Sequence, residues 1–368
     1  MRGCRKVVAG VAMAGLLGTI AAPAAAAGEQ DPLGGALDRL VQAGFPGGLA
    51  YLRAGERVRY ATAGVAELRT GEPVRPGQRF RIASNTKAFV ATVLLQLVGE
   101  GELSLADSVE RWLPGTVRGE GYDASKITVR QLLNHTSGIH DPRDPHFFDP
   151  YLKDENWGYV YTPDEVIRQS LLDPPDDKPG YTNTGYLLLG KIIERVTGND
   201  VRDEISARIL RPLGLKDTYF PLTDPHIRGP HLHGYDFGLR DMSVFSPSYD
   251  WTAGAMVSTV DDLAAFHRAL FEGDLLEPEQ QRLLKELAPG GHYALGVERG
   301  SVDCPSGERT IWGNTGGGPG YTSMSFTTED GSRQLVFVLT QFDLAADQAG
   351  RLPWQAVPTP LLEAGLCS

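Results

Sequence analysis

A long apolar segment that carries one lysine near its start constrains this chain most. Residues 88–98 are apolar except for Thr92 and Gln96, which predicts a buried helix. Ser84 lies just ahead of it, and serine is favoured at helix N-termini. Ser84 and Lys87 are three residues apart, so they share a helix face. An unpaired lysine would be costly to bury there, so we expect the two side chains to act together.

The pair suggests a nucleophile beside its base. A serine hydroxyl is a weak nucleophile until another group takes its proton. A partly desolvated lysine near positive potential can lose its own proton near neutral pH and act as that base. Ser-x-x-Lys is common by chance. Ser84–Lys87 is the single occurrence of this pattern in the sequence, and further catalytic motifs are needed before it indicates an active site.

The N-terminus has the features of a signal peptide. Arg2, Arg5 and Lys6 are followed by an apolar stretch at 7–20 and an alanine-rich stretch at 22–27. This pattern predicts cleavage near residue 27 and a secreted mature chain of 28–368. The protein would be extracellular, or periplasmic if the cell has an outer membrane. The alternative, an uncleaved membrane anchor, is disfavoured because the apolar stretch is short.

Charge and composition narrow the possible partners. The 368 residues are 41% hydrophobic and 22% charged, as in ordinary globular proteins. Losing three basic residues with the signal peptide would change the formal net charge from -11 to -14. An acidic chain is not expected to bind nucleic acid or an anionic membrane surface.

Two cysteines, Cys304 and Cys367, remain in the predicted mature chain. Export to an oxidising compartment favours a disulfide between them. Two free thiols are the alternative.

Strand patterns at both ends of the chain enclose a helical middle. Strands are predicted at 48–53, 57–65, 293–297, 309–312, 321–327 and 334–340, with a hairpin turn at Asp330-Gly331. The fold class is therefore α/β in the α+β sense: an antiparallel sheet flanked by helices, with an inserted all-α subdomain. The sheet subdomain would span about 28–104 and 248–368, and the α-rich insert about 105–247.

The segment 141–161 is unusually aromatic and acidic. It predicts either a loop folded onto the core or the wall of a binding cleft.

Tyr181-Thr182-Asn183 is a candidate partner for Ser84. The motif follows a loop signal and precedes a helix, so its side chains can project into a cleft. A tyrosine near the Lys87 ammonium should have its phenolate favoured, so that it can take the serine proton and pass one to a leaving group. Asn183 could bind a substrate carbonyl and hold Lys87. The alternative is an ordinary loop with an asparagine helix cap.

A third candidate element is the glycine-rich segment 313–318, which includes Asn314, Thr315, Gly316 and Gly317. At the end of a predicted edge strand, its glycines would let a substrate backbone approach. They would also leave a backbone N–H free to face a developing oxyanion.

Together the three motifs resemble the class C β-lactamase and DD-carboxypeptidase superfamily of penicillin-recognising serine hydrolases. The segments 128–138, 179–183 and 253–262 look characteristic of it. The resemblance implies that Ser84 is acylated and that Lys87 and Tyr181 transfer protons. It further implies that Asn183 binds substrate and that the N–H groups of Ser84 and Gly317 form the oxyanion hole. It implies no cofactor.

Asn314 departs from the family pattern, which has lysine or histidine there to help bind a substrate carboxylate. Asparagine brings no charge. Arg299 could supply the missing cation, although Glu298 beside it would oppose this.

The leading functional prediction is a D-alanyl-D-alanine carboxypeptidase acting on small, possibly cell-wall, peptides, with β-lactams as possible acylating inhibitors. The alternatives are a β-lactamase-like esterase or amidase for neutral substrates, and a non-catalytic penicillin-binding-like module. The clustered histidines are His226, His231 and His233. Their spacing does not indicate a metal site, so no metal is predicted.

Overall fold

The computed structural model describes residues 31–348 and 359–367. The predicted signal peptide, 1–27, lies outside the described residues. No helix among the described residues is both long enough and apolar enough to span a bilayer.

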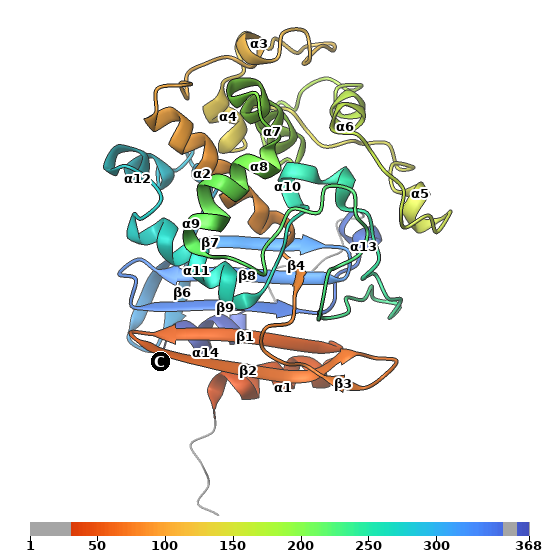
Figure 1. Cartoon of the computed structure of the whole chain (residues 1–368), viewed down its shortest axis with the longest axis vertical. Helices are drawn as coiled ribbons and strands as arrows, with labels where there is room; N and C mark the ends of the chain where they lie inside the picture. Colours follow the sequence, from red (N-terminus) through yellow and green to blue (C-terminus); the bar gives the residue numbers. More distant parts are fainter. Residues whose placement is uncertain (1–30, 349–358, 368) are drawn as a thin grey trace, which may run out of the picture. The chain divides into compact units, whose positions relative to one another are not determined.

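Seven antiparallel strands form the main sheet, in the order β3-β2-β1-β9-β8-β7-β6 (Figure 1). The strands are β1 (Gly47–Ala54), β2 (Arg57–Glu67), β3 (Glu72–Pro73), β6 (Glu298–Cys304), β7 (Gly307–Gly318), β8 (Tyr321–Thr328) and β9 (Arg333–Leu339). A separate short pair consists of β4 (Phe80–Arg81) and β5 (Val257–Ser258). β1 pairs with β9 in the middle of the main sheet, from Gly48 opposite Leu339 to Ala54 opposite Arg333. The two ends of the chain therefore build one sheet, which confirms the predicted fold class.

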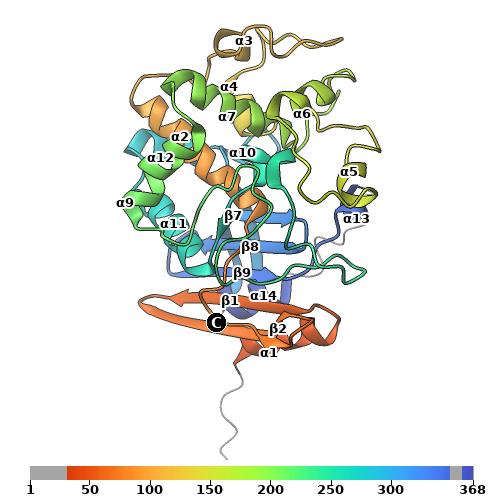
Figure 2. The same ribbon diagram turned by 45° about the vertical axis from the view of Figure 1, so that its right-hand side comes forward.

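Helices lie on both faces of this sheet and form a further group beyond it. Those of the described residues are α1 (Pro32–Gln42), α2 (Thr86–Gly99), α3 (Val109–Trp112), α4 (Val129–Leu133), α5 (Asp149–Leu152), α6 (Pro163–Ser170), α7 (Thr184–Thr197), α8 (Val201–Ile205), α9 (Arg211–Leu213), α10 (Trp251–Gly254), α11 (Val260–Glu272), α12 (Pro278–Leu284), α13 (Leu344–Gln348) and α14 (Thr359–Leu366). Helices α3, α4, α6 and α7 gather on the side away from β1 and β2 (Figure 2). The predicted insert at 105–247 contains α3 to α9, and its boundaries stay a prediction.

The sheet separates two apolar cores because neighbouring strand residues point to opposite faces. On β1, Leu49 and Tyr51 belong to the larger core, whereas Ala50 and Leu52 belong to the smaller one. The smaller core is closed by α1 and α14, and α11 packs against β8 and β9 on the other face.

Helix α2 is buried nearly all round, with 0% exposure at Lys87, Val90 and Leu94. It packs against α7, α8, α10 and α12, which explains why its sequence is apolar on every face. The turn just before it, residues 83–85, lies next to β7 and β8, at the boundary between the helices and the sheet.

One strand prediction is wrong. Residues 293–297 form a buried loop in which Gly296 has φ +90°, and the strand is β6, which follows it. β6 forms the edge of the sheet, and Val302 is its one residue in the apolar core, so its sequence lacks an apolar alternation. β7 is consequently not an edge strand along its first half.

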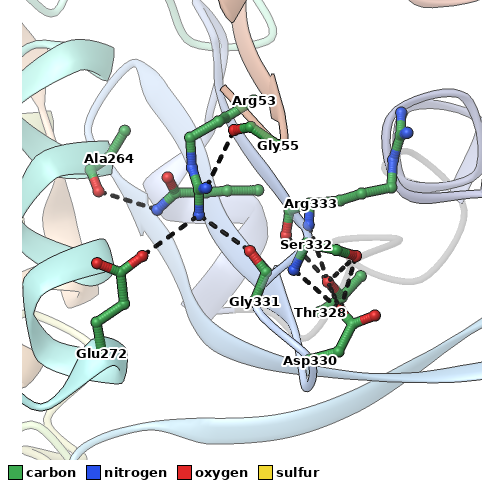
Figure 3. A network of polar contacts seen from close by, with 10 residues as sticks. Arg53, Gly55, Ala264, Glu272, Thr328, Asp330, Gly331, Ser332 and Arg333 are labelled. Carbon is green, nitrogen blue, oxygen red and sulfur yellow. Dashed lines mark hydrogen bonds and ion pairs between the residues drawn. The ribbon is translucent and has the colours of Figure 1, made fainter. Parts of the chain in front are cut away.

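The predicted hairpin at Asp330-Gly331 joins β8 to β9 (Figure 3). Asp330 accepts hydrogen bonds from the Thr328 hydroxyl and from the Ser332 N–H and hydroxyl, which lower its pKa to about 2. Arg53 at the end of β1 donates to the carbonyl of Gly331 at 3.1 Å. The turn is thus tied to the neighbouring strand.

Cys304, at the end of β6, and Cys367, just after α14, form a disulfide with a Cα–Cα distance of 5.1 Å. It links the edge of the sheet to the helix that covers the smaller core.

Because the bond closes a loop across 63 residues, we expect it to contribute ~2–4 kcal/mol to the free energy of unfolding. Thiol titration of the denatured, unreduced chain 28–368 should find no free thiol. Replacing both cysteines with serine should lower the unfolding free energy by that amount. Two titratable thiols in the native chain would disprove the bond.

Candidate active site

Ser84 lies in a tight 3₁₀ turn, Ala83–Asn85, which we call the serine turn. Several elements hold this turn. The Ile82 N–H donates to the Met256 carbonyl at 3.0 Å, and the Ser323 hydroxyl on β8 donates to the Ile82 carbonyl at 3.1 Å. The Asn85 side chain donates to the same carbonyl at 3.2 Å. These bonds fix Ser84 directly before α2, as its sequence position predicts.

The serine turn is strained and closely packed. Ala83 has φ +45°, a left-handed conformation that costs energy for a residue with a side chain. A Cβ at Gly316 on β7 would lie 2.3 Å from the Ile82 carbonyl oxygen. The sequence predicts that the β7 glycines admit a substrate backbone. In the structure, Gly316 instead leaves room for the serine turn to pack against β7. This contact brings Ser84 to the edge of the sheet.

Lys87 uses all three of its N–H groups inside the protein. Nζ lies 2.9 Å from Ser84 Oγ, 2.7 Å from Asn183 Oδ1 and 2.8 Å from the Ala253 carbonyl oxygen. An ammonium has three donors, so the protonated form is fully satisfied by these contacts. The three partners come from the serine turn, the loop before α7, and α10.

Burial lowers the pKa of Lys87 to about 8, while the nearby carboxylates of Asp250 and Asp141 act in the opposite direction. Desolvation, rather than a neighbouring positive charge, is therefore the cause of the shift. With this pKa, roughly one molecule in ten has an unprotonated Lys87 at pH 7. The lysine can serve as the base for Ser84.

Tyr181 also faces this pair. Its ring centroid lies 4.8 Å from Lys87 Nζ, and its hydroxyl hydrogen-bonds with Ser84. Tyr181 is 52% exposed as a whole, while its hydroxyl lies beside the half-buried Ser84.

The expectation that Lys87 favours the Tyr181 phenolate is wrong. Burial of the hydroxyl raises its pKa well above the usual value. The bond to Ser84 opposes this shift, and the negative charge of Asp250 adds to it. Tyr181 therefore keeps its proton at neutral pH and is suited to donating it.

Asp141 positions the Tyr181-Thr182-Asn183 loop. One oxygen, Oδ1, accepts hydrogen bonds from the Thr182 hydroxyl at 2.8 Å, the Asn183 N–H at 2.7 Å and the Thr184 N–H at 2.8 Å. A carboxylate at the first turn of α7 also interacts favourably with the helix dipole. This residue fixes Asn183 so that its side-chain oxygen meets Lys87.

The second half of β7 has an open edge. β6 stops pairing with β7 at Glu298, opposite Gly313. The Thr315 N–H points to this edge, where it donates to Glu298 Oε1 at 2.5 Å. Backbone orientation repeats every two residues, so the Gly317 N–H faces the same edge. The predicted oxyanion donor is thus directed away from β8, beside the serine turn.

Asn314 does not face this edge. It is 1% exposed, and its amide nitrogen donates to the Gly296 carbonyl at 2.9 Å. Arg299 is exposed on β6 opposite Trp312, and the structure records no contact of its side chain with Ser84, Lys87 or Tyr181. Among the described residues, neither Asn314 nor Arg299 places a positive charge at this edge, and the Glu298 carboxylate lies there.

Sequence reasoning missed two acidic residues around the site, Asp141 and Asp250, and named a third, Glu298, only as a charge that opposes Arg299. Asp250, before α10, is 5% exposed, and burial raises its pKa to about 6 although Lys87 lowers it. Burial also raises the pKa of Glu298, against its hydrogen bonds with Thr315. The acidic character of the 141–161 segment was a signal for Asp141. The other two have no local sequence signal, because the fold alone brings them to Ser84.

The aromatic segment 141–161 is partly folded onto the core and partly lines a cavity. Tyr151 and Tyr161 are buried in the larger core, at 0% and 6% exposure. Phe147 and Phe148 line a cavity that also contacts Asn183 and Gly317.

Among residues 31–348 and 359–367, no three His, Cys, Asp or Glu side chains are grouped to hold a metal ion. Of the clustered histidines, His233 pairs with Asp241 at 2.6 Å, and its ring stacks on His231 at 4.9 Å.

Known proteins share this arrangement of fold and sequence. A model of the Beta-lactamase family matches residues 25–357. Penicillin-binding protein 4* of Bacillus subtilis (strain 168) is 27% identical over 314 residues, which cover 80% of this chain and 68% of that protein.

Two solved structures are similar over nearly their whole length. A D-stereospecific amidohydrolase from Streptomyces sp. is 34% identical with a TM-score of 0.79, covering 91% of this chain and 98% of that one. The D-amino acid amidase from Ochrobactrum anthropi SV3 in complex with L-phenylalanine amide is 28% identical with a TM-score of 0.75, covering 90% and 97%.

The ionisation of Lys87 predicts a pH profile. Since unprotonated Lys87 is the active base, kcat/KM should rise about tenfold per pH unit on the acid side and level off above about pH 8. The high pKa of Tyr181 should keep the profile level to about pH 10. The measurement is ester hydrolysis from pH 5.5 to 10, with activity at pH 8 after exposure to each pH as the control for unfolding. A flat profile between pH 6 and 9 would contradict this role of Lys87.

Proposed function

Because this chain belongs to the Beta-lactamase family of serine hydrolases, we propose that it hydrolyses small amides, esters or peptides whose leaving group has no carboxylate. Ser84 is acylated and then released by water. One observation carries the choice of leaving group: the Glu298 carboxylate lies at the open edge of β7 near Tyr181, while the family's cation position is taken by the neutral, buried Asn314.

The proposed reaction follows from the contacts of Ser84. Unprotonated Lys87 takes the proton of the Ser84 hydroxyl, 2.9 Å away, as the oxygen attacks the substrate carbonyl carbon. The carbonyl oxygen becomes an anion that the N–H groups of Ser84 and Gly317 stabilise. Tyr181 donates its proton to the leaving group as the C–N or C–O bond breaks, and protonated Lys87 returns a proton to Tyr181.

Hydrolysis of the acyl-enzyme reverses these roles. A water molecule attacks the ester carbonyl and gives its proton to the Tyr181–Lys87 pair. The Ser84 oxygen leaves with a proton from Lys87, which restores the free enzyme.

Glu298 disfavours a carboxylate on the leaving group for an electrostatic reason. It lies on the edge where such a group would be placed, and like charges repel more strongly in a partly desolvated cleft than in water. Asn314 is buried against Gly296, and Arg299 extends from the exposed face of β6, so neither offsets this charge. The two amidases described above support the same choice, since amide leaving groups are neutral.

A D-alanyl-D-alanine carboxypeptidase activity is the second candidate. Its support is the likeness to penicillin-binding protein 4* over 80% of the chain. β-Lactams would then acylate Ser84 as slow substrates. We rank this activity second because the leaving D-alanine would bring its own carboxylate close to the Glu298 carboxylate.

The proposed location is outside the cytoplasm, as the N-terminal sequence suggests. The Cys304–Cys367 disulfide supports this location, since structural disulfides persist in oxidising compartments.

A pair of substrates that differ only in leaving-group charge tests the proposal. We expect the native enzyme to cleave a dipeptide amide at pH 8 with a kcat/KM roughly fivefold or more above that of the dipeptide acid. This ratio corresponds to about 1 kcal/mol of repulsion. Glu298→Gln keeps the bond from the Thr315 N–H and should remove most of the preference.

Arg299→Ala is the matched control on the same strand and should leave the ratio unchanged. A strong preference of the native enzyme for the free acid would overturn the choice of leaving group and favour the carboxypeptidase.

A further inference from the structure

A cavity of about 650 Å³ extends from the active site on the side of Asn183 and Gly317. Asn183 bonds to Lys87, and Gly317 carries the proposed oxyanion donor, so this cavity is continuous with the site. Glu298 is not among its lining residues, so we assign the cavity to the acyl part of a substrate and the Glu298 edge to the leaving group.

The cavity is strongly acidic. Four of its lining residues are Asp141, Asp144, Asp250 and Asp347. The one basic lining residue, Arg143, is ion-paired with Asp176. A cavity of this charge favours a cation.

Asp250 carries a carboxylate oxygen that has no hydrogen-bond partner among the described residues. The residue is 5% exposed, and this oxygen is Oδ1. Lys87 is close enough to affect its ionisation, but no ion pair joins them, because the three N–H groups of Lys87 are used by Ser84, Asn183 and Ala253. A buried carboxylate without its full set of hydrogen bonds is costly, and Asp250 lines the cavity, so a donor bound there would offset this cost.

Asp250 is also next to the reacting serine. A Cβ added at Gly254 would lie 1.7 Å from Asp250 Oδ2 and 3.5 Å from the Ala83 carbonyl carbon. The carboxylate thus lies against the serine turn. A cation that reaches it must be near the carbonyl carbon that Ser84 attacks, as a group on the adjacent α-carbon is.

The rest of the cavity is suited to an apolar side chain. Phe147, Phe148 and Tyr249 line it, with the rings of Phe148 and Tyr249 5.1 Å apart in an edge-to-face arrangement. Aromatic walls of this kind bury apolar groups well.

We propose that this cavity binds the α-ammonium and the apolar side chain of an α-aminoacyl group, with Asp250 as the main partner of the ammonium. The inference rests on the proposed function and adds the acyl half of the substrate. The enzyme would then require a free α-amino group and act on amino-acid amides, esters or peptides from their N-terminus.

Three types of p-nitroanilide test this, each with the same neutral leaving group: phenylalanyl in both configurations, N-acetylphenylalanyl, and 3-phenylpropionyl, which lacks the amine. At pH 6.5 the α-amino group is mostly protonated, since its usual pKa is about 7.7. For the native enzyme, kcat/KM should be about 10- to 100-fold higher for the better phenylalanyl substrate than for the other two types.

Asp250→Asn should reduce this ratio at least tenfold. The ratio separates ammonium binding from any effect on Lys87, because a change in the base alters all three substrates alike. The matched control is Asp154→Asn, at an exposed aspartate of the aromatic segment 141–161 that does not line the cavity. It should keep the native ratio.

Equal or faster cleavage of the 3-phenylpropionyl substrate by the native enzyme would overturn the inference while leaving the proposed function standing. This comparison needs no variant, so it decides the matter even if Asp250→Asn does not fold. If a fluorophosphonate fails to label Ser84 and no anilide is cleaved, the proposed function fails and the inference fails with it.

Discussion

The structure depends on the way Lys87 is buried. Its ammonium is 0% exposed, yet it meets three acceptors at 2.7 to 2.9 Å from three separate parts of the chain. Each contact is a charge-assisted hydrogen bond, and losing one would leave a buried charge incompletely paired. The serine turn, the loop before α7 and α10 are therefore held together by the group that activates Ser84. The same burial lowers the pKa of Lys87, so one feature both assembles the site and tunes its base.

Carboxylates on two sides of this lysine divide the site into two halves. Glu298 lies at the open edge of β7, where leaving groups would be placed, and Asp250 lies beside the acyl cavity. The first disfavours an anionic leaving group, and the second favours a cationic acyl group. The chain shares its fold with the two solved structures described above. The charges of Glu298 and Asp250 are features of individual side chains in the site, not of that fold. Selectivity here is thus an electrostatic property of side chains placed on a common framework.

The parts of the site that the sequence could predict are those set by local spacing. Ser84 and Lys87 face each other because a helix repeats every 3.6 residues. The positions of Glu298 at the β7 edge and of Asp250 beside the serine turn could not be predicted, because they depend on pairing of β6 with β7 and on packing of α10. The strand β6 was missed for a related reason: an edge strand with few buried residues has no apolar alternation. The direction of the Tyr181 pKa shift was also beyond reach, since it depends on burial.

The most direct test of the account is identification of the acylated residue. The native chain is treated with a fluorophosphonate, denatured, digested with trypsin and analysed by mass spectrometry. One adduct is expected, on the peptide of residues 82–87, with Ser84 as the modified residue. Ser84→Ala, folded as judged by circular dichroism, should show no adduct and a rate loss of ~10³-fold or more. An adduct on another residue, or one that persists in Ser84→Ala, would contradict the account.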